Sequence, residues 1–202
     1  MPLPTSEEFR KKFLEAFDEC CEEATLRNSF KEAWMNWTAF MTGKSTKVDS
    51  WDRRAVLPTV AKEFDLEIEQ EFMRLDLVFY KKNGCPLAVA IEHENVPRGI
   101  ETELDKLFLV RSRLKVLITY AWKGSEKFVA VKDELTETVR KYYQYYTSNL
   151  LPEPPETEYL FLLGNEETQK SIAWYYLPLE VRRYGKELFS DFTLDGWATD
   201  QA

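Results

Sequence analysis

The chain has 202 residues, of which 44% are hydrophobic and 31% charged, and its seven Gly and nine Pro form no biased tract. This composition is sufficient for one sizeable core and excludes disordered, collagen-like and low-complexity proteins. The formal net charge of −8 disfavours general nucleic-acid binding, but residues 74–141 carry thirteen Lys or Arg against ten Asp or Glu, so DNA is compatible with the middle of the chain.

Two helices are predicted at the N-terminus. A capping-box sequence at Thr5–Glu8 is followed by phenylalanines at helical intervals, which predicts a helix over residues 7–24. A second helix is predicted from Asn28, which can cap its start, to Gly43, which favours its end. We interpret residues 1–43 as an acidic helical hairpin appended to the main domain.

The next segment changes from helix to strand. A third helix is predicted over residues 51–64, with a kink favoured at Pro58. Acidic and apolar residues then alternate over Leu66–Phe72, and an extended segment continues over Arg74–Tyr80, so we expect strands here. Because no Gly, Pro or Asn separates them, the pattern leaves open whether this is two strands or one bent strand.

A hairpin and a further helix follow. Asn83-Gly84 is a strong turn signal, and residues 86–94 form the predicted return strand. Apolar residues at core spacing then predict a helix over residues 100–108, before another strand over residues 115–121.

The last third of the chain begins with a long predicted helix over residues 127–147. Strand-like segments follow at Tyr159–Leu163 and Ile172–Leu177, and the last fifteen residues read as a loosely docked tail. Residues 152–202 therefore supply C-terminal strands and a tail. Too few residues follow the proline-rich linker to fold alone, so we expect a single α/β domain over residues 1–202.

The cysteines and the single histidine limit the available chemistry. Cys20, Cys21 and Cys85 lack zinc-ligand spacing, so we expect reduced thiols and no zinc site. The longest apolar runs are far shorter than the ~20 residues of a membrane-spanning helix. The N-terminus also lacks the apolar stretch of a secretion signal. We therefore expect a cytoplasmic protein with no membrane partner.

Three acidic residues lie in the predicted hairpin. Asp76 is on its first strand, and Glu92 and Glu94 are on its second. Strand alternation places Glu92 and Glu94 on one face together with Ala88 and Ala90, whose small side chains leave room around the carboxylates.

The register of the hairpin decides whether Asp76 joins that face. A two-residue turn would place Asp76 opposite Ile91, with the acids on opposite faces. A three-residue turn with a bulge would place Asp76 opposite Ala90 or Glu92, and the carboxylates would then converge.

Converging carboxylates favour a bound cation, because like charges so close raise each other's pKa. Oxygen ligands select a hard cation such as Mg²⁺ or Mn²⁺, which takes one or two carboxylates together with waters and phosphate oxygens. Phosphodiester hydrolysis is the chemistry that such a site supports, since a metal activates water and stabilises charge at phosphorus.

The sequence Arg74-Leu-Asp-Leu-Val-Phe-Tyr, the hairpin and Val89-Ala-Ile-Glu-His-Glu resemble the PD-(D/E)xK nuclease superfamily, which has the restriction-endonuclease-like fold. The resemblance covers residues 51–122, with the element order helix, three strands, helix, strand. It implies that Asp76 and Glu92 bind Mg²⁺ with the backbone carbonyl of His93. It also implies that both acids are catalytic together with Glu94, that the substrate is DNA, and that a homodimer is a candidate assembly.

Two positions depart from the superfamily pattern. Leu75 stands where a proline usually precedes the first acid, and Glu94 stands at the lysine position. Some restriction enzymes of the superfamily use glutamate there, so Glu94 fits a metal ligand or a base that orients water. Lys106 can replace the lysine only if the following helix directs it towards the acids, and Glu63 on the preceding helix is a candidate additional metal ligand.

Several candidates also have a purely structural interpretation. The three acids could form the solvated face of an edge hairpin. His93 is more typical of a hydrogen-bonded core histidine than of a catalytic one. Four basic residues either contact DNA phosphates or keep a helix and a strand end soluble: Arg111, Arg113, Lys115 and Lys123.

The sequence therefore predicts a metal-dependent phosphodiester hydrolase, a Mg²⁺-dependent deoxyribonuclease of the PD-(D/E)xK type. The alternative is a catalytically inactive copy of the fold that binds nucleic acid or a protein partner. Glutamate at the lysine position is compatible with either.

Overall fold

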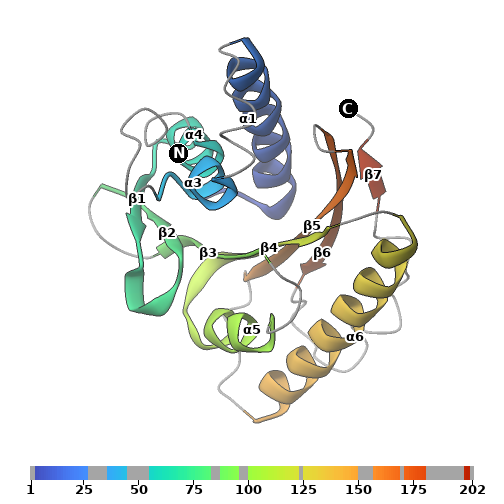
Figure 1. The fold of residues 1–202 in the computed structure, drawn as a ribbon. Coiled ribbons are helices and arrows are strands. Elements are labelled where there is room, and N and C mark those ends of the chain that lie inside the picture. Colours follow the sequence, from blue (N-terminus) through green and yellow to red (C-terminus); the bar gives the residue numbers. More distant parts are fainter. Residues whose placement is uncertain are drawn as a thin grey trace.

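A computed structural model shows an α/β protein whose sheet is covered by helices on both faces (Figure 1). The structure describes nine segments, residues 3–26, 36–44, 55–82, 87–95, 100–122, 125–149, 157–168, 171–180 and 198–200. The helices of this described part are α1 (Ser6–Leu26), α3 (Trp37–Thr42), α4 (Val56–Glu63), α5 (Ile100–Leu109) and α6 (Ser125–Asn149).

The described strands form one open mixed sheet. The first four are β1 (Glu67–Gln70), β2 (Leu77–Tyr80), β3 (Leu87–Glu94) and β4 (Ser112–Ala121). The next two are β5 (Glu158–Thr168) and β6 (Ser171–Glu180), and the three-residue strand β7 (Ala198–Asp200) pairs with β6 at the edge. The spatial order of the strands follows the sequence order.

The pairing of neighbouring strands changes twice across the sheet, from antiparallel to parallel and back. The pairs β1–β2 and β2–β3 are antiparallel, whereas β3–β4 and β4–β5 are parallel, and β5–β6 is antiparallel again. Helices α5 and α6 supply the long connections that parallel neighbours require. Both pack on the same face of the sheet (Figure 1). The order α4, β1, β2, β3, α5, β4 matches the predicted order of elements.

Helices α1, α3 and α4 cover the other face (Figure 1). Phe9 and Phe13 of α1 are completely buried, and the Phe13 ring meets Trp174 of β6 edge-on with centroids 4.8 Å apart. The expected N-terminal hairpin is therefore no appendage where the structure describes it, because α1 shares a core with the sheet. Residues 27–35, which hold half of the predicted second helix, lie outside the described segments.

Local sequence signals explain several helix ends. Thr5 and Glu8 form the predicted capping box, since each backbone N–H donates to the side chain of the other at 2.9 and 3.2 Å. Gly43 ends α3 in the left-handed region with φ 73°. Pro58 lies in the first turn of α4, where no intrahelical N–H is needed, so the predicted kink is absent from the described helix.

The segment between residues 66 and 80 forms two strands. They are joined by a short 3-10 turn, η1 (Phe72–Arg74). None of the described helices is long and apolar enough to cross a membrane.

Candidate active site at the β2–β3 hairpin

The register of the β2–β3 hairpin brings Asp76 and Glu92 to the same face of the sheet. Leu77 pairs with Ile91, so Asp76, one residue earlier, faces Glu92. The converging arrangement is therefore the one that the structure adopts. The predicted turn at Asn83-Gly84 lies outside the described segments.

An irregularity within the strands produces this register. Tyr80 pairs with Leu87, but Phe79 pairs with Val89, so Ala88 is an extra residue on β3. Ala88 and Val89 consequently pack in the same core, beneath α1 and α4. The prediction that Ala88 shares the face of Glu92 is wrong for this reason, whereas Ala90 does pack on the α5 face.

Asp76 immediately precedes β2, at the edge of the described ladder. Its Oδ2 accepts a hydrogen bond of 2.9 Å from the backbone N–H of His93. Its backbone carbonyl accepts another, of 3.0 Å, from the N–H of Glu71. Asp76 is half-buried, so its carboxylate is held in place while part of it still faces solvent.

Glu92 is completely buried, and its Oε1 has no hydrogen-bond partner in the described part of the chain. Burial raises the pKa of Glu92 to about 10, and a hydrogen bond with Glu103 and the charge of Asp76 add to this effect. Lys106 acts in the opposite direction. Without a further cation, burial therefore favours the protonated form of the Glu92 carboxyl.

Lys106 is directed towards the acids by helix α5. Its Nζ lies 3.4 Å from Oε2 of Glu92 and also contacts Oε2 of Glu103, one turn earlier on the helix. Desolvation lowers the pKa of Lys106, but the hydrogen bond to Glu103 and the two carboxylate charges outweigh it and the net shift is upward. Helix α5 therefore directs Lys106 towards the acids, which its role in place of the missing lysine requires.

Glu103 was not among the predicted site residues. Its side chain is only 15% exposed and interacts with both Lys106 and Glu92. The signal for it was the i, i+3 spacing of Glu103 and Lys106 on one helix face. That signal alone does not distinguish a solvated pair from one directed towards a sheet.

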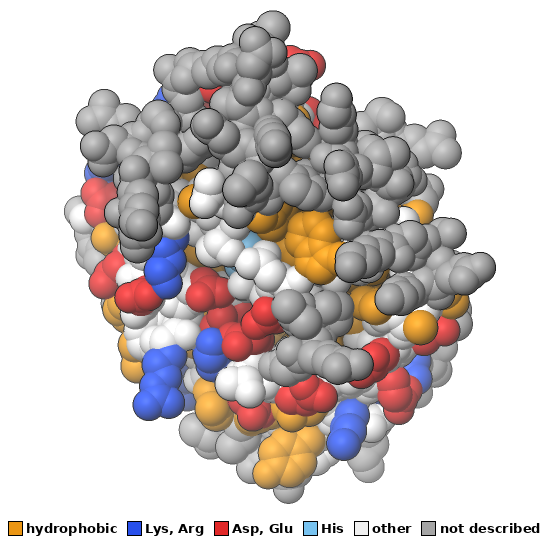
Figure 2. Space-filling view, in the orientation of Figure 1, with side chains coloured by type: hydrophobic (Ala, Val, Ile, Leu, Met, Phe, Trp, Pro, Cys, Tyr) orange, Lys and Arg blue, Asp and Glu red, His pale blue; other side chains and the backbone are white. Residues whose placement is uncertain are grey.

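Glu94 lies two residues after Glu92, at the end of β3, and is half-buried. Its neighbour on β4 is Thr119, which is completely buried and whose hydroxyl has no described hydrogen-bond partner. Figure 2 shows Asp and Glu side chains gathered across the centre of this surface, with Lys and Arg side chains beside them.

The side chain of His93 lies on the opposite face of the sheet. It is 7% exposed, its Nε2 is 2.9 Å from the Tyr120 hydroxyl, and burial lowers its pKa to about 4. This is the environment of a hydrogen-bonded core histidine. Only the backbone of His93 belongs to the acidic site.

The structure does not bring Glu63 to the other acids. Glu63 ends α4, which packs on the opposite face of the sheet from Asp76, and its carboxylate pairs with Lys12 of α1 at 3.2 Å. The candidate assignment of Glu63 as a metal ligand is therefore wrong, because the helix that precedes β1 covers the other side.

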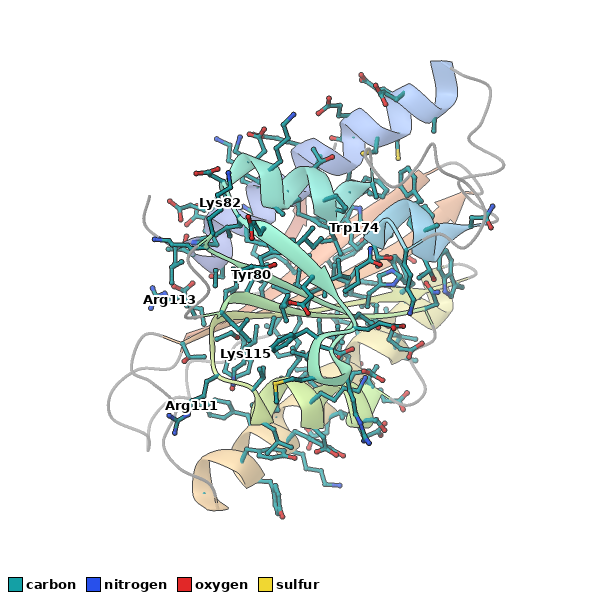
Figure 3. All side chains as sticks on the ribbon, turned by 90° about the vertical axis from the view of Figure 1, so that its left-hand side faces the viewer. Tyr80, Lys82, Arg111, Arg113, Lys115 and Trp174 are labelled. Carbon is teal, nitrogen blue, oxygen red and sulfur yellow. The ribbon has the colours of Figure 1, made fainter. Side chains whose placement is uncertain are left out.

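Three of the four candidate phosphate-binding residues, Arg111, Arg113 and Lys115, are labelled in Figure 3 and lie in different environments. Arg111 is exposed, and Arg113 is half-buried and donates to Glu158 at 3.1 Å. Lys115 is completely buried and donates to the Tyr159 hydroxyl at 3.1 Å, so its assignment as a phosphate contact is wrong. Lys123 lies outside the described residues.

The donor set fits a hard divalent cation held by few protein ligands. Two carboxylates face each other, and one buried carboxylate oxygen has no partner. Mg²⁺ requires one or two carboxylates and otherwise keeps water. Within the described residues, no group of three or more His, Cys, Asp or Glu is placed to hold a metal, so a larger protein cage is absent there.

No protein-family model, curated protein or solved structure matches this chain.

Proposed function

We propose that this protein is a metal-dependent phosphodiester hydrolase acting on DNA, with a site of the PD-(D/E)xK type. The observation that carries the proposal is the facing pair of Asp76 and Glu92, which Lys106 approaches from α5. The order of helix, three strands, helix and strand around this pair supports it.

The two acids differ in what their environments prepare them to do. Asp76 is half-buried and its carboxylate accepts a hydrogen bond from the N–H of His93. Glu92 is completely buried beside Glu103 and Asp76. Asp76 and Glu92, with the carbonyl of His93, would hold Mg²⁺ or Mn²⁺. The bound cation would supply charge stabilisation at phosphorus and a more acidic water.

Lys106 takes the place of the lysine that the sequence lacks at Glu94. Its ammonium group lies beside Glu92. From there it would stabilise the negative charge that develops on a phosphate oxygen during the reaction. Glu94, on the same strand face, is placed to orient a water by accepting its hydrogen bond. Glu103 holds Lys106 in this position.

The test is cleavage of supercoiled, linear and single-stranded DNA by the purified protein with Mg²⁺ or Mn²⁺. Asp76→Asn and Glu92→Gln keep the side-chain shape and remove a charge, so each should lower cleavage by at least ~10²-fold. Glu63→Gln is the matched control, because it removes a carboxylate on the other face and should cleave like wild type.

Loss of cleavage in both site variants, with an active control, would support the proposal. An inert but folded wild-type protein would contradict it and would favour the inactive, partner-binding alternative. Equal activity in wild type and Glu92→Gln would exclude this site.

A further inference from the structure

The turn between β1 and β2 immediately precedes Asp76 and has an unusual backbone. Glu71, Met73 and Arg74 have φ values of 57°, 50° and 72°. This left-handed region is disfavoured for residues with a Cβ and is usually left to glycine. Strained backbone of this kind clusters at ligand clamps and active sites.

The core fixes this turn from both ends. Leu75 is buried and Phe72 is half-buried between the sheet and the α5–α6 layer. The N–H of Leu75 donates to the carbonyl of Phe72 at 2.8 Å. The shape of the turn is therefore tied to the position of Asp76, which it precedes along the chain.

The two residues between these anchors are directed outwards. Met73 is 77% exposed, the largest exposure among the large hydrophobic side chains of the described residues, and Arg74 is exposed as well. A strained, anchored turn that presents a methionine and an arginine to solvent has the form of a binding element.

We propose that this turn inserts into duplex DNA, with Met73 entering between adjacent bases and Arg74 contacting the flanking backbone or minor groove. DNA-bending proteins use Met and other apolar side chains as such wedges, with Arg beside them. The inference rests on the proposed nuclease function. A kink in the DNA at the point where Met73 enters would expose the DNA backbone next to Asp76, which lies three residues further along the protein chain.

The experiment uses the full-length Glu92→Gln protein, so that DNA is not cut, and duplexes that carry 2-aminopurine at one position at a time. This base fluoresces more strongly when it is unstacked. We expect an increase at one or two neighbouring positions on binding. Met73→Ala should abolish the increase, whereas Met73→Leu should retain it, because leucine is also an apolar wedge.

Arg74→Ala tests the contact with the backbone. It should weaken binding of all duplexes alike and make the slope of log K against log salt shallower by about 0.9, the loss of one phosphate contact. Both side chains are exposed, so neither substitution should affect folding, and an unchanged melting temperature checks this.

The two proposals fail in different ways. The first outcome is an unchanged fluorescence increase when Met73→Ala is added to the Glu92→Gln protein, together with metal-dependent cleavage by a Met73→Ala protein that retains Glu92. This outcome would overturn the wedge and leave the nuclease proposal standing. Binding with an increase that depends on Met73, but no cleavage by wild type, would support the wedge as part of a binding module. Absence of any duplex binding would overturn the wedge.

Discussion

The backbone N–H of His93 donates a 2.9 Å hydrogen bond to Asp76 on one face of the sheet, while the His93 imidazole contacts Tyr120 on the other. One residue therefore links the position of a candidate metal ligand to the packing beneath α1, α3 and α4. Trp37 of α3 also packs edge-on against Tyr120, with ring centroids 5.7 Å apart. The described N-terminal helices α1 and α3 thus pack on the face of the sheet opposite the site.

His93 should make the protein sensitive to acid. Its pKa is about 4 in the folded protein against about 6.5 when unfolded, so the unfolded chain binds a proton that the folded protein excludes. Stability should fall as the pH drops from 6.5 to 4, by up to ~1.4 kcal/mol per pH unit. His93→Gln cannot titrate and should reduce this slope, measured by urea unfolding at several pH values. Identical slopes for the two proteins would contradict the prediction.

Glu92 should have the opposite pH dependence in metal-free protein. Its folded pKa of about 10 lies above the unfolded value of 4.5, so the folded state keeps a proton that the unfolded chain releases. Stability should therefore fall as the pH rises above 4.5, by up to ~1.4 kcal/mol per pH unit. Glu92→Gln should be more stable than wild type at pH 8 in EDTA. Glu69→Gln, at an exposed position of β1, is the control.

Added Mg²⁺ should raise the melting temperature of wild type and not of Glu92→Gln. A ligand that binds only the folded state stabilises it by RT ln(1 + [L]/Kd), or about 2.7 kcal/mol at a hundredfold excess over Kd. The measurement is a thermal scan over a range of metal concentrations. A shift of equal size in both proteins would place the cation elsewhere.

Glu103 and Lys106 should act as one unit. We expect Lys106→Met to lower kcat more than it raises KM, because the ammonium group is assigned to charge that develops in the reaction. Glu103→Gln should have a smaller effect of the same kind, and Lys106→Arg should restore part of the rate. The double variant should lose less than the two single losses combined, since the residues touch. Additive losses would argue against a shared role.

Phe13→Ala should show that α1 belongs to the core. Phe13 is completely buried against the sheet, so its truncation should cost about 3–5 kcal/mol of unfolding free energy. Leu109→Ala, at a 64% exposed position, should stay within about 0.5 kcal/mol of wild type. Urea unfolding of both proteins checks this. A small effect at Phe13 would favour the appended hairpin that the sequence suggested.

The order of helices and strands around the site was predictable because each has its own period and breakers. The capping box of α1 and the core-spaced residues of α5 were both clear in the sequence. The turn at residues 71–74 was not clear, since non-glycine residues adopt its left-handed backbone. No composition signal marks a turn of that kind.

The candidate acids were found because strand alternation is a local property, whereas their environment depends on tertiary packing. Spacing could identify Glu92 but not the approach of Lys106 and Glu103 from another element. It also could not show that α4 covers the opposite face, which removes Glu63, or that Lys115 is buried beside Tyr159 of β5.

The extra residue at Ala88 shifts the alternation of side chains along β3 by one position. Residues before and after it therefore differ in which sequence positions face α5. If Ala88 were paired in the ladder instead of bulged, the Tyr80–Leu87 pairing would continue along the whole hairpin and place Asp76 opposite Ile91. The two carboxylates would then be separated by the thickness of the sheet, with every residue type unchanged. The bulge at Ala88, and not only the identity of the acids, therefore decides that both acids lie on one face of the sheet.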